Sequence, residues 1–313
     1  MKKVSIVVPC FNEEENVVAM AGAIKQQMQD LDDYSYDIIF IDNDSKDNTR
    51  ALIRQLCAED NHVKAIFNSK NYGQFSSPYY GVLQATGDCA ILLSCDFQEP
   101  VDLIPVFLKE WEAGYKLVMG QKTSSKESGL IYAARGFYYR FMAKHSDVEF
   151  LPQVTGFGLY DRSFIEVMRA IQDPRPFLRG LISEVGYGVK LIPYEQSKRR
   201  GGKSSNNFFT YIDAIAQSLT TYTKFGCRLA LGCGFVATIA SIVTMVAFFI
   251  YKLINWNTFP VEDYIASLVI ILLCSMNLFF IGVVGEYVMD VNIRARRKPL
   301  VIEAERINFQ DQP

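Results

Sequence analysis

The chain has 313 residues, of which 50% are hydrophobic and 21% are charged, and its formal net charge is −2. A net charge this close to zero argues against a nucleic-acid-binding protein, and two histidines are too few for a zinc site built on histidine and cysteine. The seven cysteines include no Cys-x-x-Cys pair, a pattern typical of reduced thiols and not of a disulfide framework.

The first 120 residues alternate between segments with the pattern of buried strands and segments with helical spacing. We expect helices at 13–31, 47–58 and around 79–85, with Asn12 as the N-cap of the first. The expected strands are residues 4–8, 36–41, 63–67 and 90–93. Alternation of this kind predicts an α/β fold with a mainly parallel sheet and helices on both faces.

Polar side chains follow three of these strands. Each set, taken alone, is also typical of a helix cap or a turn. Because the carboxyl ends of parallel strands meet at one edge of a sheet, where ligands bind, we expect the sets to converge. Carboxylates and amides there suit a divalent cation that bridges diphosphate oxygens. The residues are Asn12 and Glu13, Asp42 and Asn43, and Asp96 and Gln98.

Two nucleotide-binding motifs are absent from the chain. It contains neither Gly-x-Gly-x-x-Gly nor Gly-x-x-x-x-Gly-Lys-Ser/Thr, so the sequence indicates neither a Rossmann dinucleotide site nor a P-loop.

Two long uncharged runs, residues 229–251 and 264–285, lie near the C-terminus. A helix over the first would be about 34 Å long, enough for a hydrocarbon core of roughly 30 Å. The alternative is two core helices of a soluble protein, which rarely run so long without a polar face. Lys224, Arg228 and the basic cluster at 294–298 predict that both termini are cytoplasmic, with a short external loop around Trp256.

Two further segments, residues 130–145 and 208–224, combine apolar or aromatic residues with helical spacing, and the first is also basic. Either could lie in the membrane interface or pack against the sheet, and the sequence leaves both interpretations open.

The order of the motifs along the chain resembles that of family-two glycosyltransferases with the GT-A fold. The C-terminal part resembles the two-span polyprenyl-phosphate glycosyltransferases, a group that includes dolichol-phosphate mannose synthases and bactoprenol glucosyltransferases. The segments that carry the resemblance are residues 8–16, 42–49, 71–74, 81, 85–88, 96–100, 199–204, 282–287 and 297–300.

The resemblance implies a Rossmann-like GT-A domain in the cytoplasm at residues 1–204 and a juxtamembrane amphipathic helix at 205–228. A hairpin of two transmembrane helices at 229–288 and a cytoplasmic tail at 289–313 would follow. The implied enzyme is a hexosyltransferase of the cytoplasmic (inner) membrane. It would transfer a sugar, with inversion, from a UDP-linked donor to undecaprenyl phosphate, for modification of a cell-envelope glycan.

The resemblance also assigns roles to individual residues. Asp96, Arg199 and Lys203 would be catalytic, and Asp96 with Gln98 would hold Mg²⁺ or Mn²⁺. The phosphate of donor or acceptor would be bound by Arg140, Arg199, Arg200, Lys203 and Ser204. The donor pocket would be formed by Pro9, Asn12, Glu13, Asp42, Asn43, Asn71, Gly73, Gln74 and Cys95. The expected partners are the nucleotide-sugar, polyprenyl phosphate and membrane lipid, with self-association left open and no nucleic acid.

Four positions depart from the family pattern. Asn43, Ser94 and Gly156 stand where relatives usually or often have aspartate, and Ser205 replaces a lysine. These changes keep open a catalytically silent subunit that presents lipid. A processive polysaccharide synthase is disfavoured, because two spans in one protomer do not form a channel and no Gln-x-x-Arg-Trp element is present.

Overall fold

The structure is a computed structural model. It describes residues 1–124, 151–174, 176–197, 199–201, 263–295 and 298–309, together with scattered positions between 232 and 254. The chain divides into two compact units. The first comprises Met1–Ala143, Val148–Asn207 and Arg296–Pro313, and the second comprises Lys144–Asp147 and Phe208–Ala295.

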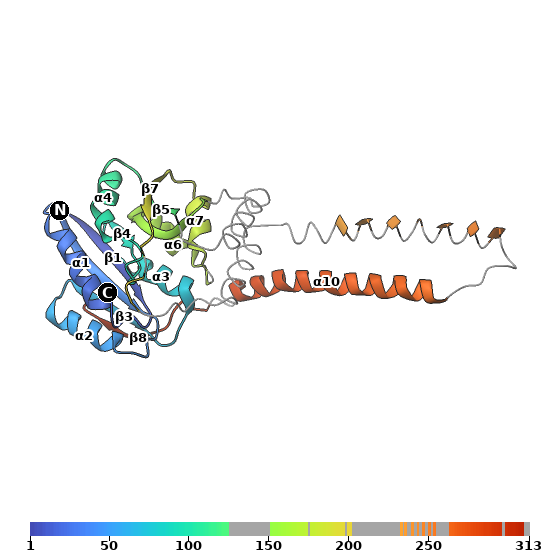
Figure 1. Cartoon of the computed structure of the whole chain (residues 1–313), viewed down its shortest axis with the longest axis horizontal. Helices are drawn as coiled ribbons and strands as arrows, with labels where there is room; N and C mark the ends of the chain where they lie inside the picture. The colour runs from blue at the N-terminus through green and yellow to red at the C-terminus, as the bar shows by residue number, and fades with distance from the viewer. Residues whose placement is uncertain are drawn as a thin grey trace. The chain divides into compact units, whose positions relative to one another are not determined.

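One sheet forms the centre of the first unit, and over the described residues it has eight strands in the order β7-β5-β6-β4-β1-β2-β3-β8 (Figure 1). β1 is parallel to β2 and β4, β3 to β2, and β7 to β5, whereas β6 and β8 are antiparallel to their neighbours. The prediction of a mainly parallel α/β sheet is therefore confirmed. The strands are β1 (Lys2–Cys10), β2 (Tyr34–Asp42), β3 (Val63–Asn68), β4 (Cys89–Leu92), β5 (Leu117–Ser124), β6 (Val154–Asp161), β7 (Val189–Glu195) and β8 (Glu303–Ile307).

Helices cover both faces of this sheet. On one face, α1 (Val17–Gln29), α2 (Thr49–Glu59) and α4 (Ile104–Glu112), the last preceded by a short 3-10 turn at Val101–Leu103, pack on one hydrophobic cluster. On the other face, α3 (Gly73–Leu83), α6 (Arg162–Ile171) and α7 (Leu178–Glu184) pack on a second cluster.

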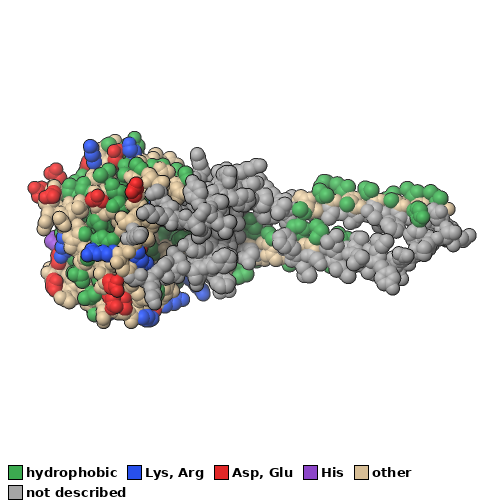
Figure 2. Space-filling model, in the orientation of Figure 1, with side chains coloured by type: hydrophobic (Ala, Val, Ile, Leu, Met, Phe, Trp, Pro, Cys, Tyr) green, Lys and Arg blue, Asp and Glu red, His purple; other side chains and the backbone are tan. Residues whose placement is uncertain are grey.

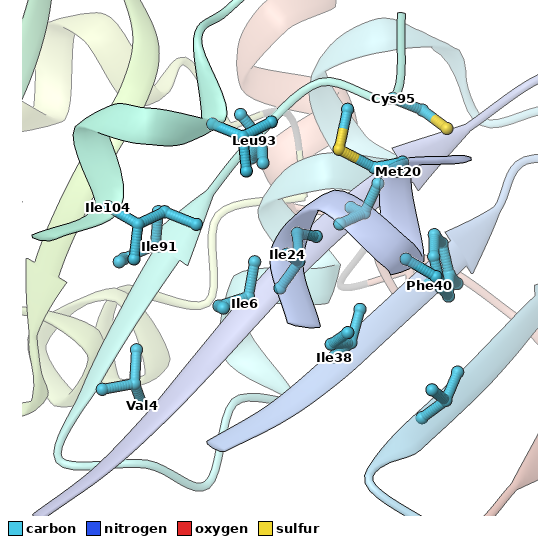
Figure 3. Packing of buried hydrophobic residues seen from close by; sticks show 14 of the residues in the cluster. Val4, Ile6, Met20, Ile24, Ile38, Phe40, Ile91, Leu93, Cys95 and Ile104 are labelled. Atoms are coloured by element: carbon cyan, nitrogen blue, oxygen red, sulfur yellow. The ribbon is translucent and has the colours of Figure 1, made fainter. Parts of the chain in front are cut away.

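The strands contribute side chains to both clusters because successive side chains point to opposite faces of the sheet. Ile6 belongs to the first cluster and its neighbour Val7 to the second. Figure 3 shows Ile6 and Ile38 of adjacent strands beneath Ile24 of α1. All three side chains are fully buried.

The first helix begins later than the sequence pattern predicts. Asn12 has a φ of 54°, in the left-handed region, so it does not cap a helix that starts at residue 13. Residues 13–16 form a turn in which the Asn16 amide donates to the Glu13 carbonyl at 2.9 Å. Asn16 then occupies the N-cap position of α1. The prediction of Asn12 as the cap is wrong, because its side chain is used by a neighbouring loop.

α3 begins earlier than predicted, at Gly73, and so brings the loop that precedes it to the carboxyl edge of the sheet. The helix can lie this close to β1 because residue 81 is glycine. A Cβ atom there would come within 2.7 Å of the Val7 Cγ1 atom, closer than packed carbon atoms approach.

The C-terminal segment contributes β8, which the sequence analysis did not predict. β8 pairs antiparallel with β3, the last of the parallel strands on that side of the sheet. Its alternation of half-buried and exposed residues suits an edge strand. Part of the predicted tail, residues 289–313, therefore completes the sheet of the first unit.

The second unit contains α10 (Asp263–Ala295). Large apolar side chains are exposed along the described positions of 235–254, among them Phe235 at 67% and Ile254 at 74%. None of the described residues of this stretch is charged, and Figure 2 shows hydrophobic side chains in this part of the chain. As far as the structure describes the helices, none is both long and apolar enough to cross a membrane. The predicted hairpin stays a prediction, and residues 130–145 and 208–224 lie outside the described residues.

Candidate active site

The loops after β1 and β2 hold each other at the carboxyl edge of the sheet. The Asn12 amide donates to Ser45 Oγ at 2.8 Å, and Asn12 Oδ1 accepts from the Lys46 amide at 2.8 Å. The Glu13 amide donates to Thr49 Oγ1, also at 2.8 Å. These bonds hold the backbone of Glu13, and Asn16 Nδ2, which donates to Glu13 Oε2 at 2.7 Å, orients its side chain.

Asp42 stabilises the loop that follows β2 at this edge of the sheet. Its side chain is fully buried and accepts from Arg50 Nε at 2.6 Å and from the Ser45 amide at 3.2 Å. Arg50 Nη2 also donates to the Asn68 carbonyl at 2.6 Å, which ties β2 to β3. In this arrangement the Asp42 carboxylate is buried against Arg50 of α2 and the loop after β2, and its predicted donor-binding role stays a prediction.

Asn43 supports the loop that precedes α3. Its Oδ1 accepts from the Tyr72 amide at 2.8 Å and from Asn68 Nδ2 at 3.1 Å. Its Nδ2 donates to Asn71 Oδ1 at 3.0 Å and to the Gly73 carbonyl at 3.2 Å. Both ends of an amide are needed for these four bonds, which explains why asparagine and not aspartate suits position 43 here.

The turn after β4 presents Asp96. Phe97 has a φ of 58°, and the Gln98 amide donates to Asp96 Oδ1 at 3.2 Å. Cys95 is 1% exposed and packs in the first hydrophobic cluster (Figure 3), and its predicted place in the donor pocket stays a prediction. The Asp96 side chain, which is 14% exposed, lies at this edge with its Oδ2 atom 3.7 Å from Arg199 Nη1, and the metal-binding role of Gln98 stays a prediction.

Glu13, Arg199 and Asp96 come together from three distant parts of the sequence. Arg199 Nη2 donates to Glu13 Oε1, and Arg199 Nη1 lies 3.7 Å from Asp96 Oδ2. The segment is held by its backbone as well, since the Arg200 amide donates to the Asp96 carbonyl at 3.4 Å. Burial raises the pKa of Glu13, against the opposing effects of Asn16 and Arg199.

The metal-ligating side chains at this edge suit a metal ion only if a diphosphate supplies further ligands. Among the described residues, no group of three His, Cys, Asp or Glu side chains could hold a metal ion by itself. Mg²⁺, however, is commonly bound by one or two carboxylates together with substrate phosphates and water. Asp96, with a side chain that is 14% exposed, could supply one such carboxylate.

A cavity of about 120 Å³ lies between the ends of β1 and β4, the start of β6 and the starts of α3 and α7. Two predicted residues, Pro9 and Gln74, line it. Glu99 and Arg179 also line it, and the sequence pattern predicts a role for neither. Glu99 could have been identified from the sequence by its place in the motif at 96–100. Arg179 could not, because it stands in an apolar stretch without a motif.

Glu99 is 7% exposed and accepts from the Ser94 amide at 2.8 Å and from Thr155 Oγ1 at 3.3 Å. Burial raises the pKa of its carboxyl, which the bonds from Ser94 partly offset.

Gly156 borders the same cavity, at the position where relatives often carry aspartate. Its φ is 110°, a conformation that residues with a side chain rarely adopt. A Cβ there would make only ordinary contacts, so backbone conformation and not space favours glycine.

Of the remaining predicted residues, Arg140, Lys203 and Ser204 lie outside the described residues. Arg200 is described, and its guanidinium lies 5.2 Å from the ring centre of Phe97, beside the Asp96 turn.

Comparison with known proteins identifies the family of this chain. An α/β sheet that gathers carboxylates, an arginine and a cavity at its carboxyl edge has its ligand site where open sheets of this class bind their ligands. Residues 5–186 match Glycosyl transferase family 2. The chain belongs to this family and is a glycosyltransferase.

Two relatives extend over nearly the whole chain. A putative glycosyltransferase CsbB of Bacillus subtilis (strain 168) is 27% identical, over 99% of this chain and 94% of its own. A bactoprenol glucosyl transferase of Shigella phage SfV is 28% identical, over 96% and 97% respectively. Among solved structures, glucosyl-3-phosphoglycerate synthase from Mycobacterium tuberculosis has a TM-score of 0.46 and 17% identity, over 70% of this chain and 78% of that one.

Proposed function

We propose that this chain transfers a sugar, with inversion, from a UDP-linked donor to a polyprenyl phosphate, undecaprenyl phosphate, and so makes a lipid-linked sugar for modification of a cell-envelope glycan. The observation that carries this proposal is the convergence of Glu13, Arg199 and Asp96 beside a cavity at the carboxyl edge of the sheet. The acceptor is suggested by relatives named bactoprenol glucosyl transferase that match from end to end.

The reaction forms a bond from an acceptor phosphate oxygen to the anomeric carbon and breaks the bond to the donor diphosphate. The acceptor oxygen is already anionic and needs little deprotonation, which makes glycine tolerable at position 156. The main demand is charge that develops on the leaving diphosphate. Arg199 can meet part of it by exchanging its bond with Glu13 for bonds with phosphate oxygens. A Mg²⁺ or Mn²⁺ ion bound at Asp96, beside Gln98, would supply Lewis-acid stabilisation of the same charge.

The proposed site of action is the cytoplasmic face of the inner membrane, with residues 229–288 as the membrane hairpin. Two observations support this placement. The described apolar side chains between 235 and 254 are widely exposed, which is unusual for a surface in contact with water. Basic residues flank the two uncharged runs on the predicted cytoplasmic side.

A panel of radiolabelled nucleotide-sugars, incubated with membranes that contain the chain and with undecaprenyl phosphate, tests the function. We expect label in the lipid fraction with one donor of the panel and none with membranes that lack the chain. Binding of undecaprenyl phosphate without transfer from any donor would favour the silent, lipid-presenting subunit. Release of a labelled polymer would favour a polysaccharide synthase.

A further inference from the structure

The cavity beside the site has the size of a single six-membered ring. Its volume is about 120 Å³, whereas a buried cavity of roughly 150 Å³ holds one benzene molecule. The cavity opens at the carboxyl edge of β1 and β4, where Pro9 and Ser94 are among the lining residues. A ring attached to a diphosphate at Asp96 could therefore enter it.

Most of the cavity wall is apolar. Phe75 and Phe177 line it as an edge-to-face pair with ring centres 5.9 Å apart, and Tyr79 and Phe157 complete the aromatic lining. A mostly apolar wall with a few fixed polar groups is typical of a site for a small organic ligand.

Glu99 provides a buried carboxyl group on this wall. It accepts from the backbone amide and the side chain of Ser94 and from the Thr155 hydroxyl, all of them neutral donors. The two oxygens of a carboxyl group carry about four lone pairs, so about one acceptor position remains for a ligand. A buried acceptor that is left without a donor is costly, and sugar hydroxyl groups are donors of the required kind.

Arg179 provides donors on the same wall. Its Nε atom donates to the Thr155 carbonyl at 3.4 Å, which is long for such a bond. A guanidinium has five N–H groups, and Arg179 lines the cavity. The cavity therefore presents both acceptors and donors, as recognition of a hydroxylated ring requires.

We propose that this cavity receives the pyranose ring of the donor, and that Glu99 accepts hydrogen bonds from its hydroxyl groups and thereby selects the sugar. The inference rests on the proposed function. It separates two tasks: Arg199 and Asp96 act on the diphosphate, and Glu99 with Arg179 acts on the sugar. A site built to bind a hydroxyl group strongly rejects a ligand that lacks it, because the buried polar group is then left unpaired.

The test measures binding of UDP and of UDP-sugars separately. The full chain, purified in detergent, is titrated calorimetrically in Mg²⁺ with UDP and with UDP-glucose, UDP-galactose and UDP-N-acetylglucosamine. Glu99→Gln keeps one acceptor for the Ser94 amide, and its NH₂ group can donate to Thr155. Glu59→Gln, which changes an exposed carboxylate on α2, is the matched control.

We expect Glu99→Gln to raise the Kd of the best-bound UDP-sugar about tenfold, because a buried hydrogen-bonding group is then left without its partner. The Kd of UDP should change by less than about twofold, and Glu59→Gln should change neither. Equal loss of UDP and UDP-sugar binding, or no loss of either, would overturn the inference.

Arg179→Ala is the second variant, in case Glu99→Gln does not fold, and should weaken UDP-sugar binding while it leaves UDP binding unchanged. If both variants bind UDP-sugars as the wild type does while the wild type transfers sugar to lipid, only this inference fails. If the wild type binds no member of the panel, the proposed function fails together with it.

Discussion

At the scale of single residues, the site is a set of opposite charges held close together. Arg199 lies between Glu13 and Asp96, so one cation offsets two carboxylates. A diphosphate with its metal would bring both negative and positive charge to this position. Arg199 could then leave Glu13 for phosphate, while the metal compensates Asp96. In that exchange Glu13 would keep the hydrogen bond that Asn16 Nδ2 donates to its Oε2 atom at 2.7 Å.

Asp96→Asn should abolish sugar transfer and weaken Mn²⁺ binding in the presence of UDP, because Ser94 leaves no second carboxylate in that triplet to replace it. Transfer assays and Mn²⁺ titration followed by electron paramagnetic resonance provide the two measurements. Asp102→Asn, which changes an exposed aspartate six residues further along the chain, should alter neither. A variant at position 96 with near-normal turnover in Mg²⁺ or Mn²⁺ would refute the metal assignment.

Arg199→Ala should reduce the rate of transfer about thirtyfold or more in detergent with a short-chain acceptor, equivalent to roughly 2 kcal/mol of transition-state stabilisation. Arg199→Lys should recover only part of this rate, because lysine lacks the planar fork of the guanidinium. Lys203→Ala should also reduce the rate, and Arg54→Ala, in an exposed pair with Glu305, serves as the control. Full activity of the substitutions at 199 and 203 would mean that this basic segment only attracts anionic lipid.

At the scale of elements, the strands are joined by side chains as well as by backbone bonds. Asp37 on β2 accepts from Lys3 of β1 and from Lys64 of β3, both at 2.8 Å. Its own side chain is 3% exposed. One buried carboxylate thus links three parallel strands at the edge opposite to the site.

Asp37→Asn should lower the free energy of unfolding at pH 7 by about 3 kcal/mol, because it leaves Lys64 without its partner. Burial alone would raise the pKa of Asp37, but the hydrogen bonds from the two lysines outweigh it and lower the pKa below its ordinary value. The carboxylate is therefore stabilising above the unfolded pKa of about 3.9, and this contribution is lost as pH falls through the lower, folded value.

Thermal unfolding of the wild type and of Asp37→Asn between pH 7 and pH 3 measures this difference. We expect the gap between the two midpoints to be largest at pH 7 and to narrow below about pH 4. A gap that stays constant over this range would show that the effect is one of packing and not of charge.

β8 is fixed to the sheet by the residue that follows it. Asn308 Nδ2 donates to the carbonyls of Cys57 at 2.7 Å and Val63 at 2.8 Å, and Asn308 has a left-handed φ of 61°. Asn308→Ala should lower the free energy of unfolding by about 2 kcal/mol, through two lost hydrogen bonds and backbone strain.

Denaturant unfolding checks this expectation. Asn308→Gly relieves the strain and isolates the contribution of the amide. Glu305→Ala, which removes an exposed ion pair, should cost less than about 1 kcal/mol. Equal stability of the wild type and the Asn308 variants would mean that β8 does not depend on this anchor.

The parallel strands of the core could be predicted because apolar runs that alternate with segments of helical spacing are typical of buried strands. The convergence of Glu13 and Asp96 followed, since both come directly after parallel strands. The spacing of apolar residues could not predict β8. This edge strand contains two glutamates and an arginine and has no buried face, so it lacks the alternation of apolar and polar residues that indicates a strand. Nor does spacing along the chain reveal that Arg50 neutralises Asp42, or that Glu99 and Arg179 line one cavity. These depend on tertiary contacts between distant segments.

At the scale of the whole molecule, the remaining question is where the catalytic unit lies relative to a membrane. A nucleotide-sugar is made and kept in the cytoplasm, so the proposed reaction needs residues 1–204 on that side. The basic residues at 224, 228 and 294–298 outweigh Lys252 in the loop between the uncharged runs, which favours this orientation. The C-terminal strand β8 belongs to the same sheet as β1 to β4, so both chain ends must share one side of any membrane.

Labelling of introduced cysteines with a membrane-impermeant reagent tests this orientation. In intact cells, Asn257→Cys should be labelled above the level of the parent chain, because position 257 lies in the predicted external loop. Gln312→Cys should be labelled only after the membrane is opened, because the C-terminus is predicted to be cytoplasmic. The reverse pattern would place the site away from its donor and would overturn the proposed placement. Labelling of both positions in intact cells would contradict the hairpin itself, since the two uncharged runs would then not separate position 257 from the C-terminus.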